Sequence, residues 1–382
     1  MHVTGMVRGL LLAAGIVALA APSLADIKSF NAAMKVKDYK AAAAAAASTW
    51  PGLDKSRKDL AVIAREFGFA AYLSGDFAAA KTYGEAASAA SRVAAEEPVL
   101  VIASDLLWRL AEYRIRPNGD TRGRLFTLLQ ARAAHPSVDL ITYLSADTVT
   151  AYDFEKGVWR DAVASAALGD RLTVNRLGYV DASFRFQLLG VAATYMLQSE
   201  APAYRSMGQL QQRITTAIGA APEGADITQL KEVYYDTMAW SSTLRAHLIA
   251  RNRLKDDEQI TQEWAKYTKS PEYLAAAPRI NPPLPEGVCI VSPNEKTDLP
   301  DYPSSAVYRG MIGAIILKLD IDEAGRAYNP RVLAAAPLKH FGDAALKGAH
   351  KIRYAAREGS APGCTLAQKD KTLMIQFSMP GC

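Results

Sequence analysis

The chain has 382 residues, and half of them are hydrophobic, which is enough for a substantial core and suggests two domains. Its 44 basic and 39 acidic residues give a formal charge of +5, and no dense Lys/Arg run contains aromatic residues, so a nucleic-acid partner is not expected. The three cysteines form no CxxC and have no histidine at ligand spacing, so neither a metal nor another cofactor is expected.

Residues 1–25 have the features of an export signal. Arg8 is the only acidic or basic residue before Asp26, and an apolar run of about twelve residues, 10–21, is followed by small residues. The run is shorter than the roughly 20 apolar residues of a membrane-spanning helix. We expect cleavage before Asp26 and a periplasmic protein, with an uncleaved inner-membrane anchor as the alternative.

Residues 26–275 are expected to be helical, because alanine is abundant and alternating β-branched runs are scarce. A local pattern recurs in which a turn is followed by an aromatic residue and, one helical turn later, by a small residue. The copies are Lys37-Asp38-Tyr39 with Ala42, Gly75-Asp76-Phe77 with Ala80, and Gly157-Val158-Trp159 with Ala162. The second copy, within 67–83, resembles a tetratricopeptide repeat, which implies stacked helix pairs. An irregular alanine-rich bundle is the alternative.

Four aromatic residues of this region, Tyr234, Tyr235, Trp240 and Trp264, have helical spacing and are expected in the core rather than in a ligand groove. The chain contains no Gly-x-Ser-x-Gly, no His-Glu-x-x-His and no phosphate-binding glycine loop. We therefore expect that the protein is not an enzyme and that it has no small-molecule substrate. An envelope enzyme with an unrecognised site is the less favoured alternative.

A proline-containing linker, 276–299, is expected to precede a small α+β domain at 300–382. Within it, Ile315, Leu317, Leu319 and Ile321 alternate with Ile316, Lys318, Asp320 and Asp322, a pattern that predicts a strand with one buried face. Gly325 supplies a hairpin turn, and 326–335 is the returning strand. Helical periodicity follows in 337–351, and a last strand in 373–379.

Two aspartates lie on the polar side of the first predicted strand. Asp320 and Asp322 stand two apart on its polar side, and we expect both to be solvated strand and turn charges.

The order of these elements, together with five marker residues, resembles the C-terminal domain of TonB-family energy transducers. The markers are Tyr302, Pro303, Gly310, Gly313 and Gly325. The chain departs from the family pattern at two places. At the end of the helix, where the family commonly has a Trp-Arg-Tyr-like run followed by proline, the chain has Ile352-Arg353-Tyr354-Ala355. At Asp301 the family frequently has a glutamine.

The resemblance implies a module that binds envelope or outer-membrane proteins. In that family a receptor segment adds as a strand along the edge of the last strand. Carried over to this chain, Met374, Gln376 and Ser378 are the expected partner-binding residues, whereas Ile375 and Phe377 are expected to support folding.

The cysteines predict one disulfide and one remaining thiol in an oxidising compartment. Cys364 and Cys382 flank the last strand and form the preferred pair, and Cys289 with either partner is the alternative.

The predicted fold is therefore an all-helical, tetratricopeptide-like solenoid followed by a small β-β-α-β TonB-like domain. The expected function is that of an exported periplasmic adaptor or scaffold. A membrane-anchored energy transducer for outer-membrane transport is the alternative, although the chain lacks a long proline-rich spacer.

Overall fold

The computed structural model describes residues 25–135, 139–173, 182–197, 200–251, 254–294, 300–308, 310–337 and 340–377. The chain divides into two compact units, one ending at Leu177 and the other beginning at Gly178. The expected signal segment, Ser378 and Cys382 lie outside the described residues, apart from Ala25 at the start of the first helix.

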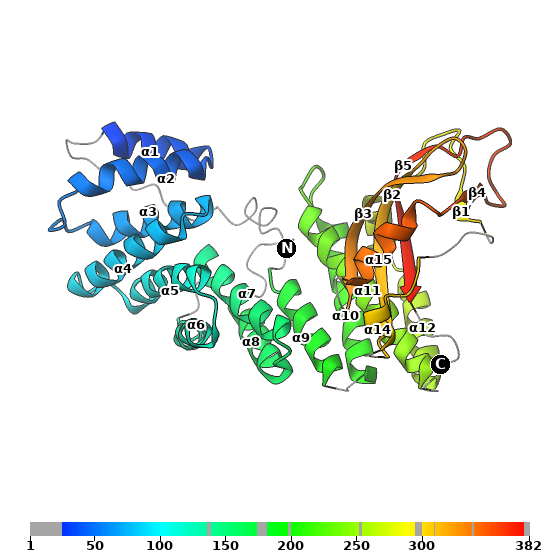
Figure 1. Ribbon diagram of the computed structural model, residues 1–382, viewed down its shortest axis with the longest axis horizontal. Coiled ribbons are helices and arrows are strands. Elements are labelled where there is room, and N and C mark those ends of the chain that lie inside the picture. The colour runs from blue at the N-terminus through cyan, green and yellow to red at the C-terminus, as the bar shows by residue number, and fades with distance from the viewer. Residues whose placement is uncertain are drawn as a thin grey trace. The chain divides into compact units, whose positions relative to one another are not determined.

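The first unit is helical, and each helix packs against the next one along the chain (Figure 1). Its helices are α1 (Ala25–Lys35), α2 (Tyr39–Thr49), the 3-10 turn η2 (Trp50–Gly52), α3 (Leu60–Ser74), α4 (Phe77–Val93), α5 (Pro98–Ile115), α6 (Gly119–Arg132), α7 (Leu140–Glu155) and α8 (Trp159–Thr173). Contacts between α3 and α5, and between α5 and α7, connect successive helix pairs. This is the packing of stacked helical hairpins.

The repeated turn–aromatic–small pattern marks helix starts. Its aromatic residues are the first residues of α2, α4 and α8, and its three alanines, Ala42, Ala80 and Ala162, are fully buried. Asp38 and Asp76 cap α2 and α4 by accepting hydrogen bonds from backbone N–H groups three residues later, at 3.0 Å each. The prediction of paired helices built around this pattern is confirmed.

Two glycines let α3, α4 and α5 approach one another closely. A Cβ atom on Gly84 would lie 2.8 Å from the backbone N and Cα of Trp108, and one on Gly68 would lie 2.8 Å from a methyl group of Leu107. These helices therefore contact each other where no side chain intervenes.

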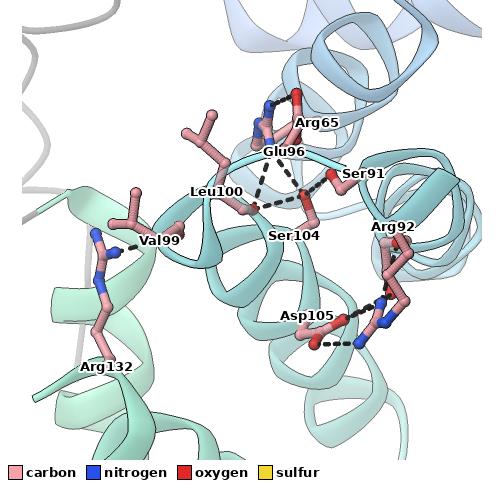
Figure 2. A network of polar contacts seen from close by, with 10 residues as sticks. Arg65, Ser91, Arg92, Glu96, Val99, Leu100, Ser104, Asp105 and Arg132 are labelled. Atoms are coloured by element: carbon pink, nitrogen blue, oxygen red, sulfur yellow. Dashed lines mark hydrogen bonds and ion pairs between the residues drawn. The ribbon is translucent and has the colours of Figure 1, made fainter. Parts of the chain in front are cut away.

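A polar network fixes the same three helices (Figure 2). Arg65 of α3 pairs with Glu96 at 3.2 Å and donates to the hydroxyl of Ser104 at 2.8 Å. Arg92 of α4 and Asp105 of α5 form a two-point ion pair, at 3.0 and 2.7 Å. Fork-shaped pairs of this kind fix orientation as well as distance.

The second unit combines helices with two small sheets. The helices are α9 (Phe184–Met196), α10 (Glu200–Ala220), α11 (Thr228–Ala250), α12 (Leu254–Tyr267), α13 (Pro271–Ile280), α14 (Ser304–Val307) and α15 (His340–Ala349). The strands are β1 (Val291–Pro293), β2 (Gly313–Ile321), β3 (Ala327–Ala336), β4 (Tyr354–Ala356) and β5 (Gln368–Phe377). Among the described helices of the whole chain, none is long and apolar enough to cross a membrane.

The larger sheet is antiparallel, with the strand order β3-β2-β5. Helix α15 packs on one of its faces, and α11 packs on the other (Figure 1). On the α11 side, the hydroxyl of Ser242 donates to the side-chain oxygen of Gln376 at 3.0 Å. The sheet is therefore covered on both faces, and its central strand is buried along nearly its whole length.

The expected linker, 276–299, carries regular structure in its described part: the end of α13 and strand β1. The boundary between the two compact units falls at 177/178, not at the expected 275, because α11 packs directly on the sheet. The helices from α9 onward thus belong to the same compact unit as the sheet.

The aromatic residues Tyr234, Tyr235 and Trp240 are at most 8% exposed, as the core prediction required. Trp264 is half-buried and packs against Tyr267, with ring centroids 5.4 Å apart.

Candidate interaction edge

A core of branched and aromatic side chains supports one face of the sheet. The alternating residues Ile315, Leu317, Leu319 and Ile321 are at most 1% exposed, which confirms the buried face predicted for this strand. They pack with Phe341 of α15 and with Phe377 of β5. Ile375 and Phe377 are 5% and 4% exposed, so both have the core position expected of residues that support folding.

The five marker residues shape this end of the sheet. Tyr302 packs edge-on against Phe377, with centroids 5.8 Å apart, and its hydroxyl donates to the carbonyl of Met311. Pro303 precedes α14, and its carbonyl accepts a hydrogen bond from the backbone of Ala306 at 2.9 Å.

The three marker glycines stand where a side chain would not fit or would be strained. A Cβ on Gly313 would lie 2.6 Å from the ring of Phe341, and one on Gly325 would lie 2.2 Å from the carbonyl oxygen of Tyr354. Gly325 and Gly310 also have φ of +74° and +60°, the left-handed region that glycine tolerates.

The two outer strands of the sheet differ in regularity. The pairing of β3 with β2 is interrupted twice, and Asn329 has φ +49° beside Pro330. Pro330 thus lies on an outer strand at a bulge, as its missing N–H requires. Bulges and prolines of this kind protect an edge from further pairing.

Strand β5 offers the regular edge. Its pairing with β2 shifts only near Asp370 and is then unbroken from Lys371 to Phe377. In the described residues β5 has no strand on its other side. Its backbone is therefore the better template for an added strand.

The expected partner-binding residues occupy different surroundings on this edge. Met374 is 48% exposed. Gln376 is also exposed, but its side-chain oxygen accepts the hydrogen bond from Ser242. Its amide is thus engaged with α11, which sequence reasoning did not anticipate.

Asp320 is not the solvated charge that alternation suggested, since it is 4% exposed. Its carboxylate accepts hydrogen bonds from the backbone N–H of Asp370 at 3.0 Å, from Asn329 at 3.2 Å and from Lys369 at 3.3 Å. Burial alone would raise the pKa of Asp320, but these donors outweigh it and hold the pKa below its usual range. The carboxylate of Asp320 thus bonds to the irregular segments of both neighbouring strands, β3 and β5. Asp322 caps the hairpin turn by accepting from the backbone of Arg326 at 2.8 Å.

The disulfide joins Cys289 and Cys364, with 2.03 Å between the sulfur atoms. The preferred Cys364–Cys382 pair is therefore wrong, and one of the alternatives is right. The bridge lies next to the bonds that tie this segment to β5: Cys289 N–H donates to the carbonyl of Thr365, and Gln368 donates to the carbonyl of Cys289 at 2.7 Å.

Comparison with known proteins agrees with this geometry. Residues 298–363 match the family model described as Gram-negative bacterial TonB protein C-terminal. The resemblance read from the marker residues is confirmed, and it follows a helical region as expected. A search of curated proteins finds no match.

The matched family is a protein-interaction domain rather than an enzyme, and its occurrence indicates an envelope role for this module. Within the described residues, no group of three or more His, Cys, Asp or Glu side chains is placed to hold a metal ion.

Proposed function

We propose that this protein is an exported periplasmic adaptor, whose TonB-like module binds a segment of an outer-membrane or other envelope protein by strand addition to β5. The observation that carries the proposal is the unbroken register from Lys371 to Phe377 on an outer strand. An added strand gains main-chain hydrogen bonds there, and side chains along the edge select the partner.

Two further features support the proposal. The disulfide fits an oxidising compartment such as the periplasm. The helical first unit has the stacked-hairpin packing that commonly presents extended binding surfaces. An adaptor of this kind would hold one partner at the sheet edge and a second on its helices.

The experiment places a photo-crosslinking amino acid at Met374 and, as a matched control, at Val332. The two residues are 48% and 36% exposed and lie on opposite outer strands. In intact cells we expect an adduct with an envelope protein from position 374 and none from 332. Equal adducts from both positions, or none from 374, would count against strand addition at β5.

A backbone change completes the test. Gln376→Pro removes one N–H of β5. If that donor faces the open edge, the crosslink from position 374 should disappear while circular dichroism stays unchanged. If the donor bonds to β2, the fold itself should weaken. A well-folded Gln376→Pro protein that still forms the adduct would exclude the mechanism and would direct attention to the helices of the first unit.

A further inference from the structure

Basic side chains from three elements meet where α11 begins beside the sheet. Lys318 of β2 is the register partner of Arg331 on β3 and of Thr372 on β5. Thr372 is hydrogen-bonded to Tyr235 of α11. Lys231 lies one helical turn before Tyr235, on the same face of α11, which directs it toward this row of the sheet.

The surroundings of Lys231 contain more positive than negative charge. Burial lowers the pKa of Lys231, and repulsion from Lys318 and from Arg279 of α13 lowers it further. Arg279 donates to the carbonyls of Ile218 and Pro222, at 2.8 and 3.2 Å, and within the described ranges it forms no ion pair with an acid. Among the described residues, Lys231 has no hydrogen bond and no ion pair.

In the described part of the chain, the carboxylate that pairs with these cations is that of Asp370. Asp370 contacts Lys318 at 3.6 Å and Arg331 at 2.5 Å. The side chains of Lys318, Arg331 and Asp370 are 33%, 49% and 55% exposed, so a ligand can reach all three. The bridging carboxylate shows what chemistry these two cations accept, since an arginine fork suits a planar carboxylate.

We propose that Lys231, Lys318 and Arg331 form a binding site for an acidic segment of a partner protein, with carboxylates that occupy or replace the position of Asp370. This basic site goes beyond strand addition, because it needs no pairing with β5. It also requires both parts of the second unit, since α11 supplies one cation and the sheet supplies two.

A peptide carboxylate fits the basic site better than a membrane surface does. Lys231 and Lys318 are only partly exposed, between α11 and the sheet. A flat layer of headgroups reaches projecting cations, whereas a peptide side chain can enter between two elements. The positive N-terminal end of α11 adds to the attraction for an anion.

The test uses the whole chain and a fluorescent hexaglutamate peptide, with hexaglutamine as the matched probe. Fluorescence anisotropy at low ionic strength should show binding of hexaglutamate only. Lys318→Gln and Arg331→Gln should each weaken binding about two- to fivefold, the effect of one partly exposed ion pair. Lys347→Gln, on the exposed side of α15 across the sheet, is the control and should change nothing.

Asp370→Asn gives an effect of opposite sign. It removes the competing carboxylate and should strengthen hexaglutamate binding about threefold, since both cations lose their internal partner. Asn also tolerates the left-handed conformation of this residue, φ +57°. Because Arg331 is exposed, its variant keeps the test valid even if Lys318→Gln folds poorly.

Three outcomes would overturn the proposal. They are absence of hexaglutamate binding, equal weakening by Lys347→Gln, and weaker binding by Asp370→Asn. A separate measurement uses phosphatidylglycerol vesicles in place of the peptide. If vesicles bind more tightly than the peptide and depend on the same residues, an anionic lipid surface replaces the acidic segment as the occupant.

Discussion

The two compact units hold their elements together over very different distances along the chain. In the first unit, each helix packs on its sequence neighbour, and the close contacts depend on small residues such as Gly84. In the second unit, Cys289 bonds to a residue 75 positions away, and Ser242 bonds to Gln376 across 134 positions. The first unit is thus built from local contacts and the second from distant ones.

This difference predicts where each unit is vulnerable. Stacked helices gain stability from each neighbour, so a defect acts where two helices touch. A sheet that joins distant segments depends on closing long loops, whose entropy must be offset. Amide exchange followed separately in each unit distinguishes these two kinds of defect.

Removal of the disulfide should have the largest effect. In the chain-entropy model a loop of this length contributes about 4 kcal/mol to the free energy of unfolding. We expect the double variant Cys289→Ala/Cys364→Ala to lose that protection at the amides of β2 and β5, while α3 to α5 exchange as before. Hydrogen exchange with mass spectrometry measures both regions in one sample. A matching loss in α3 to α5 would show that the two units are not independent.

A single methyl group at Gly84 should act on the first unit alone. Gly84→Ala places a Cβ 2.8 Å from the backbone of Trp108, and overpacking of this kind costs about 1–3 kcal/mol. The control is Gly123→Ala on α6, where nothing lies within 4 Å of the new atom. There the better helix propensity of alanine should stabilise by about 0.5–1 kcal/mol. Gly84→Ala should speed the exchange of α4 and α5 amides, whereas Gly123→Ala should slow the exchange of α6 amides. A change in the same direction for both variants would refute the packing argument.

The same contrast explains what the sequence could and could not predict. The starts of α2, α4 and α8 follow from short-range patterns, because a turn, an aromatic residue and a small residue stand within one helical turn of each other. The buried face of β2 follows from alternation for the same reason.

Contacts between residues far apart in the chain leave no short-range pattern in the sequence, so they could not be predicted. Alternation placed Asp320 on a polar face, but α11 and two bulges cover that face, and the residues responsible lie elsewhere in the chain. Spacing could not choose among the cysteine pairs, because connectivity is set by the folded sheet. The basic site was also missed, since Lys231 and Lys318 are brought together only by the packing of α11 on the sheet.

The smallest expected effect concerns Asp236 on α11, the helix through which the helical part of the second unit contacts the sheet. Asp236 is half-buried, and burial, opposed by the charge of Arg185 and reinforced by that of Glu232, raises its pKa to about 7. The folded-state pKa exceeds the unfolded value of about 3.9, so the charged form destabilises the fold. Stability is therefore lost as the pH rises from about 4 through about 7, and the loss is complete above that range.

Asp236→Asn removes this charge and should stabilise the second unit near pH 8, with little effect near pH 2.5, where both states are protonated. The full shift corresponds to about 4 kcal/mol, and solvent screening of this half-buried group reduces the expected gain to about 1 kcal/mol. Exchange of α11 amides, corrected for the intrinsic pH dependence of exchange, measures the difference. Glu286→Gln, in an exposed loop of the same unit, controls for the loss of one negative charge. The first unit should not respond, because α11 belongs to the other compact unit. If α11 in the unchanged protein keeps the same protection across this pH range, burial does not set the protonation of Asp236, and the tight packing assigned to this helix must be revised.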